Sequence, residues 1–374
     1  MKTLWARLGL VLAVLTLLAA GAAPTEAASR RYTAIATGGE HACAITSSGE
    51  VYCWGSNQLG QLGNGDATHT RSTVSVAVAG NLRFKSIAAS MNTTCAITSS
   101  GKAYCWGENN QGELGNGDAG VNNSDVPVAV VGGLRFSAIS AGTSHFCGVS
   151  RSSRVHCWGL NNDGQLGAGA VEGVSSSTPV AASSSLRFKS ITTSHYGVCG
   201  IASSNSVYCW GSNQLGQNGN GSTLVKQVLE SRLVRLESTE TENCGLTRQG
   251  ELLCRDNNGS YSKVIGAPQY MDLSVASGEV YSLCGIKTDG SVSCWGLDWG
   301  GTAAASPTAL NTTLKFRSVT QGGIQAGQDQ FACGLTRGGV AYCWANGNGT
   351  FGNLNEGQLG DGTRDWSTDP VRVQ

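Results

Sequence analysis

The sequence contains fourteen cysteines, the residues in it best able to do chemistry, because they can form disulfides or bind metal ions. They form seven pairs, each with nine intervening residues: Cys43 with Cys53, Cys95 with Cys105, Cys147 with Cys157, Cys199 with Cys209, Cys244 with Cys254, Cys284 with Cys294, and Cys333 with Cys343. Zinc sites usually take their thiolates from a C-x₂₋₄-C spacing, which does not occur here. The regular even pairing therefore favours disulfides over metal ligation.

The residues inside each pair predict a β-hairpin. A turn residue stands six positions after each first cysteine: Gly49, Gly101, Ser153, Asn205, Gly250, Gly290 and Gly339. Gly and Asn tolerate the positive φ of hairpin loops. A loop at residues 47–49 would pair Thr46 with Glu50 and place Cys43 opposite Cys53. Opposed residues on antiparallel strands bring their Cβ atoms within about 4.5–5.5 Å, and the closer pairs reach disulfide distance. Each cysteine pair is thus expected to staple one hairpin.

The other polar residues predict no catalytic, cofactor-binding or metal-binding residues. Neither a Ser/His/Asp order nor a carboxylate pair stands out. His41 and His145 precede their cysteines by two positions and are expected to have hydrogen-bonding roles. Six tryptophans directly follow a second cysteine, and strand alternation places them on the opposite sheet face from the disulfide. We expect these tryptophans to pack between repeats.

The N-terminus predicts a signal peptide over residues 1–28. Lys2 and Arg7 precede an apolar segment, Leu8–Ala20, and small residues follow it. This segment is shorter than the ~20 residues that span a bilayer, which disfavours the alternative, a retained membrane anchor. Cleavage is expected to leave a mature chain that starts between Pro24 and Ser29. The prediction is a secreted, extracellular domain over residues 29–374 without stable membrane insertion.

The charge balance gives no sign of a polyanionic partner. Lys+Arg and Asp+Glu both number 25, and charged residues make up 13% of the chain, against about 25% in typical soluble domains. Bulk charge therefore predicts no nucleic-acid partner and no acidic membrane partner. Local patches are left open.

The cysteine pairs mark a repeat. Their first cysteines are separated by 52, 52, 52, 45, 40 and 49 residues. A short strand such as residues 82–87 precedes each predicted hairpin, and an outer strand such as residues 125–131 follows it. Four strands in each of seven units predict an all-β fold, a seven-bladed β-propeller of four-stranded antiparallel blades.

The segments after the second cysteines resemble the regulator of chromosome condensation repeat. The matching stretches are CWGSNQLGQLGNG (53–65), CWGENNQGELGNG (105–117), CWGLNNDGQLGAG (157–169) and CWGSNQLGQNGNG (209–221). The paired cysteines resemble the extracellular propellers of crinkly-type plant receptor kinases and of β-lactamase-inhibitor-like secreted proteins. Units five to seven depart: Arg255 replaces the tryptophan of unit five, and the Gly-Gln-Leu-Gly of unit seven (357–360) comes seven residues late.

This resemblance implies non-enzymatic recognition of an extracellular protein or other macromolecule. Three alternatives stay open: inhibition of an extracellular enzyme, an enzyme with a site in the central channel, and guanine-nucleotide exchange. Export argues against the third. No cofactor is expected.

Loop lengths predict which face binds. In an antiparallel meander, the first–second and third–fourth connections share one face of the disc. Units six and seven carry extra residues in these connections, and functional residues concentrate in long loops on rigid scaffolds. Neutral drift is the alternative explanation. The candidate partner-binding residues are Trp299, Gln325, Gln328, Asp329 and Phe351.

Six N-x-Ser/Thr sequences offer glycosylation acceptors if the host glycosylates exported proteins. They are at Asn92, Asn122, Asn220, Asn258, Asn311 and Asn348.

Overall fold

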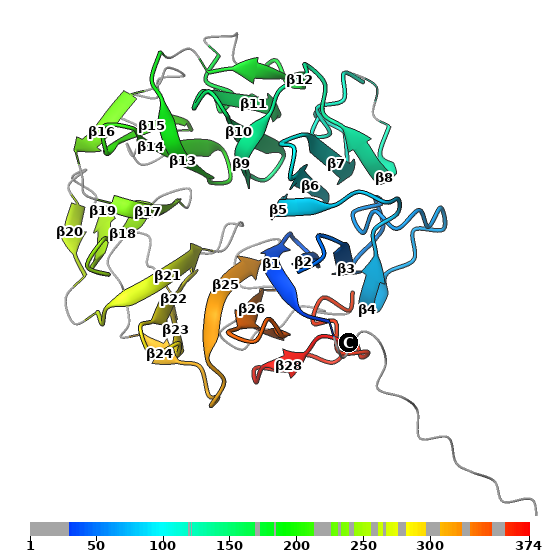
Figure 1. The fold of residues 1–374 in the computed structure, drawn as a ribbon, viewed down its shortest axis with the longest axis vertical. Helices are drawn as coiled ribbons and strands as arrows, with labels where there is room; N and C mark the ends of the chain where they lie inside the picture. Colours follow the sequence, from blue (N-terminus) through cyan, green and yellow to red (C-terminus); the bar gives the residue numbers. More distant parts are fainter. Residues whose placement is uncertain are drawn as a thin grey trace, which may run out of the picture.

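Seven four-stranded antiparallel sheets are arranged around a central axis (Figure 1). The computed structural model describes residues 30–118, 120, 122–168, 173–182, 185–212, 226–230, 233–238, 243–255, 261–264, 267–275, 282–296, 307–323, 330–345 and 356–374. Each sheet uses four strands that are consecutive in the chain. The predicted seven-bladed propeller is therefore confirmed.

The strands of each blade run outward in chain order from the axis. The first strands are β1 (Tyr32–Thr37), β5 (Phe84–Ala89), β9 (Phe136–Ala141), β13 (Phe188–Thr193), β17 (Leu233–Ser238), β21 (Tyr270–Val275) and β25 (Phe316–Gly322). The second strands are β2 (His41–Thr46), β6 (Thr93–Thr98), β10 (His145–Ser150), β14 (Gly197–Ala202), β18 (Asn243–Thr247), β22 (Ser282–Lys287) and β26 (Phe331–Thr336).

The third strands carry the second cysteines. They are β3 (Val51–Gly55), β7 (Ala103–Gly107), β11 (Val155–Gly159), β15 (Ser206–Gly211), β19 (Leu252–Arg255), β23 (Val292–Gly296) and β27 (Ala341–Ala345). The fourth strands are β4 (Ser72–Ala77), β8 (Ser124–Ala129), β12 (Ser176–Ala181), β16 (Lys226–Glu230), β20 (Tyr261–Lys263), β24 (Thr308–Ala309) and β28 (Val371–Arg372).

The hairpin register is the one that the cysteine spacing predicts. Cys43 lies directly opposite Cys53, and Ile45 lies opposite Val51. The turn residue Gly49 has a φ of +86°, the left-handed conformation that glycine adopts without steric cost. The same direct opposition of the two cysteines recurs in the other six blades.

All seven predicted disulfides are present, and each joins two strands of one blade. Their Cα–Cα distances are 4.0–4.1 Å, and none of the described cysteines is free. The disulfides join Cys43 to Cys53, Cys95 to Cys105, Cys147 to Cys157, Cys199 to Cys209, Cys244 to Cys254, Cys284 to Cys294, and Cys333 to Cys343. The predicted pairing is therefore confirmed in every blade.

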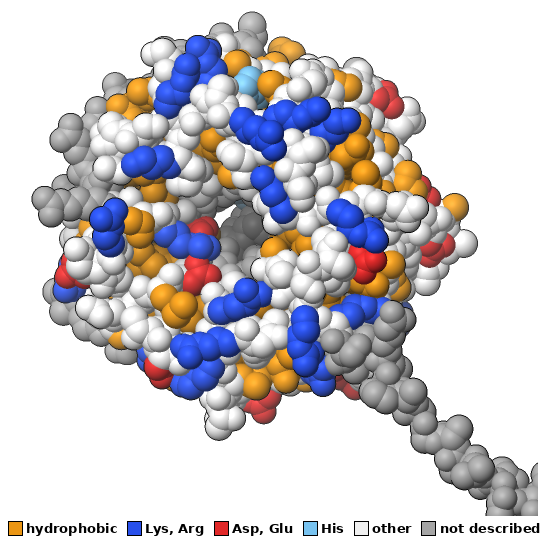
Figure 2. Space-filling view, in the orientation of Figure 1, with side chains coloured by type: hydrophobic (Ala, Val, Ile, Leu, Met, Phe, Trp, Pro, Cys, Tyr) orange, Lys and Arg blue, Asp and Glu red, His pale blue; other side chains and the backbone are white. Residues whose placement is uncertain are grey.

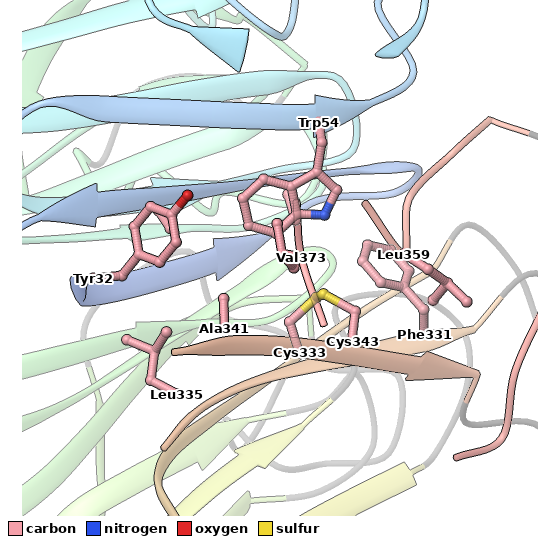
Figure 3. Packing of buried hydrophobic residues seen from close by; sticks show 11 residues of the cluster. Tyr32, Trp54, Phe331, Cys333, Leu335, Ala341, Cys343, Leu359 and Val373 are labelled. Atoms are coloured by element: carbon pink, nitrogen blue, oxygen red, sulfur yellow. A yellow bond between two sulfur atoms is a disulfide. The ribbon is translucent and has the colours of Figure 1, made fainter. Parts of the chain in front are cut away.

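Five blade interfaces are each built from one disulfide and one tryptophan of the next blade. In Figure 3, the Trp54 ring of blade one lies beside the Cys333–Cys343 disulfide and Leu359 of blade seven. The same cluster recurs where Trp106 meets Cys43–Cys53 and where Trp158 meets Cys95–Cys105. These tryptophans are fully buried. Their predicted packing role between repeats is confirmed, and the disulfide also forms the opposing surface.

The Gly-Gln-Leu-Gly loops connect neighbouring blades through the same tryptophans. Trp106 Nε1 donates to the Gln61 carbonyl at 3.0 Å, and Trp54 Nε1 donates to the Gln358 carbonyl at 3.0 Å. The equivalent bonds join Trp158 to Glu113 and Trp210 to Gln165. The late motif of unit seven therefore occupies the same place as its counterparts. The side chains of Arg255 and Trp295 lie outside the described residues.

The ring closes between blades seven and one without exchange of a strand. The Tyr32 amide donates to the Gly339 carbonyl at 2.8 Å, and the Ser75 amide donates to the Gln374 carbonyl at 2.9 Å. The first of these bonds repeats the Phe84–Gly49 contact between blades one and two. The closing joint therefore has the same contacts as an internal joint.

Candidate functional site

A central channel with a volume of about 400 Å³ lies at the centre of the ring. The first strand of every blade contributes to its lining, and Figure 2 shows the hollow at the ring centre. Most lining side chains are Ala, Ile, Ser and Thr, for example Ile87 and Ser140. The channel wall is thus largely neutral.

One charged cluster interrupts this neutral wall. Arg235 of β17 places its Nη2 3.2 Å from Glu237 Oε1, and its Nη1 2.5 Å from Asp272 Oδ1 of β21. Burial raises the pKa of Glu237 to about 7, although the Arg235 charge opposes the change. Burial also raises the pKa of Asp272. The two carboxylates balance the charge of the guanidinium within the cluster. Because Asp272 belongs to β21, the cluster also joins blade five to blade six.

His41 and His145 are fully buried. His41 Nε2 lies 2.8 Å from Thr94 Oγ1 of the next blade, and burial lowers the pKa of His41 to about 4. Burial, followed by the nearby His195, lowers the pKa of His145 to about 3. The expected hydrogen-bonding role is confirmed for His41. It is wrong for His145, whose two ring nitrogens are buried without a hydrogen-bond partner among the described residues. The described residues contain no group of three or more His, Cys, Asp or Glu side chains placed to hold a metal ion.

The meander defines two faces of the disc. The hairpin face carries the second–third turns and the links between blades, and the loop face carries the first–second and third–fourth connections. At six joints the hairpin turn of one blade is hydrogen-bonded to the start of the next at 2.8–2.9 Å, as Gly49 O is to the Phe84 amide. The hairpin face is therefore uniform and firmly connected at these six joints.

The hairpin face is strongly basic. Its exposed basic residues include Arg31, Arg83, Lys85, Lys102, Arg151, Arg154, Arg187, Lys189, Arg248, Lys263, Lys315 and Arg337. Arg30, Arg135, Lys287 and Arg317 are half-buried there. Strand β16 ends at Glu230 on this side. Three acidic side chains are described on this face, and each forms an ion pair with an exposed basic residue: Glu50, Glu251 and Asp289. Figure 2, which draws this face, shows Lys and Arg side chains around the whole ring.

The loop face has the opposite charge. Its described acidic residues are Glu40, Asp66, Glu108, Glu113, Asp118, Asp125, Asp163, Glu356, Asp361, Asp365 and Asp369. The basic side chains described on it are Arg71 and Arg364, and Arg71 lies 2.6 Å from Glu356. A net charge of zero therefore conceals two oppositely charged faces. The basic charge of the hairpin face could have been predicted from the sequence, because an Arg or Lys directly precedes most of the first-strand aromatic residues.

The predicted partner-binding residues lie outside the described residues. This holds for Trp299, Gln325, Gln328, Asp329 and Phe351. The strands around them place their connections on the loop face: residues 323–330 join β25 to β26, and residues 346–370 join β27 to β28. In blade one, residues 38–40 and 56–71 make the corresponding connections. The predicted excess length is therefore present on that face.

The glycosylation acceptors differ in accessibility. Asn122 and Asn311 are exposed. Asn92 is half-buried, and its Nδ2 donates to Glu108 Oε2 at 3.1 Å. Asn220, Asn258 and Asn348 are outside the described residues, as is the predicted signal peptide. Within the described part of the chain, no helix is long and apolar enough to cross a membrane.

Each blade is one continuous segment of chain, and bonds from tryptophans to loops join neighbouring blades. These features define a disulfide-stapled propeller scaffold of the kind that mediates protein interactions. Regulator of chromosome condensation (RCC1) repeat models match residues 48–97, 100–149 and 152–201, and a second such model matches residues 32–61, 84–113 and 136–165. The matched segments, which together extend from residue 32 to residue 201, are repeats of this family. Propellers of this type act mostly as regulators or binding modules.

The relatives show how far the likeness extends. The chain is 34% identical over 194 residues to the ultraviolet-B receptor UVR8 of Arabidopsis thaliana, which covers 52% of this chain and 44% of the receptor. The chain thus spans less than half of that relative. Prp20p of Saccharomyces cerevisiae shares the fold with a TM-score of 0.68 and 17% identity, covering 92% of this chain and 87% of Prp20p.

A further structural likeness is to the ectodomain of the Arabidopsis thaliana receptor kinase ACR4. It has a TM-score of 0.54 and 20% identity, and covers 85% of this chain and 97% of that one. At this identity the likeness is one of fold.

Proposed function

We propose that this protein is an exported, non-enzymatic recognition module that binds a protein or other macromolecule through its loop face. The observation that carries the proposal is the extra length of the connections in blades six and seven. Residues 276–281, 323–330 and 346–370 all connect strands at the loop face, whereas the hairpin turns keep one length around the ring. A ligand-binding surface on a rigid repeat scaffold is expected where the repeat is broken.

The scaffold supports such a role because it holds these connections on a fixed frame. The disulfides Cys284–Cys294 and Cys333–Cys343 join the second and third strands of blades six and seven, and so restrain the strands that flank the insertions. Binding to a preorganised surface avoids the entropic cost of ordering it. Phe351 and Trp299 supply aromatic side chains of the type enriched in interaction hot spots.

Inhibition of an extracellular enzyme is the form of this function favoured by the resemblance to β-lactamase-inhibitor-like propellers. An enzyme acting in the central channel has less support, because its described charged groups, Arg235, Glu237 and Asp272, are engaged with one another. Guanine-nucleotide exchange is disfavoured by the proposed export and by the cysteine staples, which suit an oxidising compartment.

The test is site-specific photocrosslinking in the organism's secreted material. A photoreactive amino acid replaces Phe351 in one variant and Ser48, on the hairpin face, in a matched control. We expect one partner to crosslink from position 351 and not from position 48. A second variant lacking residues 346–355 should keep the melting temperature and lose that partner. Crosslinking of the partner from position 48 alone would show that the loop face is the wrong one.

A further inference from the structure

The hairpin face is a basic, even surface with no insertion in its turns. Every blade places its turn residue six positions after its first cysteine. Hydrogen bonds between turn and link repeat at six joints. The basic residues occur in all seven blades instead of following one groove or stripe. The geometry therefore offers positive charge over a disc, not along a line.

The guanidinium groups of this face are partly preorganised. In blades one to three the arginine before the first-strand aromatic donates to a nearby link carbonyl: Arg31 to Arg30 O, Arg83 to Leu82 O and Arg135 to Leu134 O. Each bond uses one of five guanidinium donors. Arg83 uses a further donor in its ion pair with Glu50. Guanidinium groups suit phosphate oxygens, which they bind in a bidentate manner.

We propose that the hairpin face docks on a planar anionic surface, the headgroup layer of a bilayer that contains anionic phospholipids. A linear polyanion could contact only part of a ring of charge, whereas a planar one reaches all seven blades. The contact would be peripheral and electrostatic, and it leaves the acidic loop face turned away from the membrane. The inference goes beyond the proposed function, which concerns the opposite face.

Charge complementarity gives the expected strength. A basic residue close to an anionic membrane surface contributes about fivefold in affinity. The binding should weaken steeply with salt, because the Debye length is about 10 Å at 0.1 M and about 3 Å at 1 M. It should be negligible on neutral lipid.

The experiment is cosedimentation of the full chain with vesicles of phosphatidylcholine alone or with 30% phosphatidylglycerol. The test variant combines Lys85→Gln, Lys102→Gln, Arg151→Gln and Arg187→Gln on the exposed hairpin face. The control combines Ala67→Glu, Val174→Glu, Arg364→Gln and Thr368→Glu on the loop face. Both variants change the net charge by the same amount, so only the location of the change differs. Melting temperatures verify that both are folded.

We expect the unmodified chain to bind only the anionic vesicles and to be released by 1 M salt. The hairpin-face variant should bind two to three orders of magnitude more weakly, and the loop-face control within about threefold of the unmodified chain. Equal losses in both variants would overturn the proposal, because net charge alone would then explain binding. Failure of the unmodified chain to bind anionic vesicles at 0.1 M salt would also overturn it.

Three further measurements distinguish an anionic membrane from other ligands that could bind the hairpin face. Soluble glycerol phosphate, at the same phosphate concentration, should not release the protein from vesicles; release would show a phosphate-binding pocket instead of a planar contact. Tighter binding of double-stranded DNA or a sulfated polysaccharide would identify a linear polyanion. Self-association in sedimentation velocity that the hairpin-face changes abolish would identify the acidic face of a second copy. Loss of vesicle binding with retained crosslinking at position 351 separates this test from that of the proposed function.

Discussion

Gly360 tests whether the ring depends on close contact at its closing joint. The residue has a φ of +69°, and a Cβ added there would lie 2.7–2.8 Å from the Trp54 indole. Gly360→Ala therefore combines two penalties. A side chain in the left-handed region costs about 1–2 kcal/mol, and overpacking a full core adds about 1–3 kcal/mol. We expect a loss of about 2–5 kcal/mol in the free energy of unfolding.

Gly133 provides a matched control. Its φ is +66°, and a Cβ there would meet nothing within 4 Å. Gly133→Ala keeps the backbone penalty and lacks the steric one, and lower entropy of the unfolded chain offsets part of it. Its expected cost is no more than about 2 kcal/mol. Gly63→Ala, which meets Trp106 at 2.6 Å, reports the same clash at an internal joint.

The assay is urea unfolding followed by tryptophan fluorescence, with equal m-values required for comparison. Gly360→Ala and Gly63→Ala should both destabilise more than Gly133→Ala, by at least about 1 kcal/mol. If all three variants cost the same, the contact between loop and tryptophan is not tight and this account of the joints is wrong. If only Gly360→Ala unfolds the chain, the closing joint is weaker than the internal ones.

Further predictions concern titration and thiols. Burial raises the pKa of Glu113 from 4.5 to about 7, so its folded form holds a proton that the unfolded form releases, and stability falls as the pH rises from 4.5 to 7. Glu113→Gln, the residue found at the equivalent positions 61, 165 and 358, should stabilise the fold at pH 8 by up to about 3 kcal/mol and by almost nothing at pH 4. The sign reverses for His41, whose pKa of about 4 lies below the ordinary 6.5: stability should fall as the pH drops from 6.5 towards 4, and His41→Gln should reduce that fall in urea titrations at pH 7 and 4.5. Denatured, unreduced mature protein should give no thiol labelling, and mass analysis should find its N-terminus between Pro24 and Ser29; several labelled cysteines or an intact Met1 would contradict the respective prediction.

The fold was predictable because its determinants are local and repeated. The spacing from Cys43 to Cys53 fixes a hairpin register, and seven copies of it fix the number of blades. Contacts between blades are less accessible to such reasoning. Nothing in the spacing says that the Gln61 carbonyl accepts from Trp106, or that the late Gln358 serves Trp54 in the same way.

The charge of the faces was predictable in principle but is invisible in the totals. The positive and negative charges cancel when they are summed along the chain. They separate onto two faces once each charged residue is assigned to a hairpin turn or to a loop. The Arg235 cluster required one more step, because Asp272 belongs to the next blade. Alternation on β17 places Arg235 and Glu237 on one side, but only the ring brings Asp272 to within 2.5 Å of the guanidinium.

The way the ring closes bears on how such proteins can change over evolutionary time. Each blade is one uninterrupted stretch of chain, and its disulfide joins two residues of that same stretch. The joint at Tyr32 and Gly339 resembles the one at Phe84 and Gly49. Recombination at these links can therefore add, remove or reorder whole blades, and every cysteine keeps its disulfide partner. The chain ends can likewise be moved to another link by circular permutation, since Gln374 already lies against Ser75 beside the first blade.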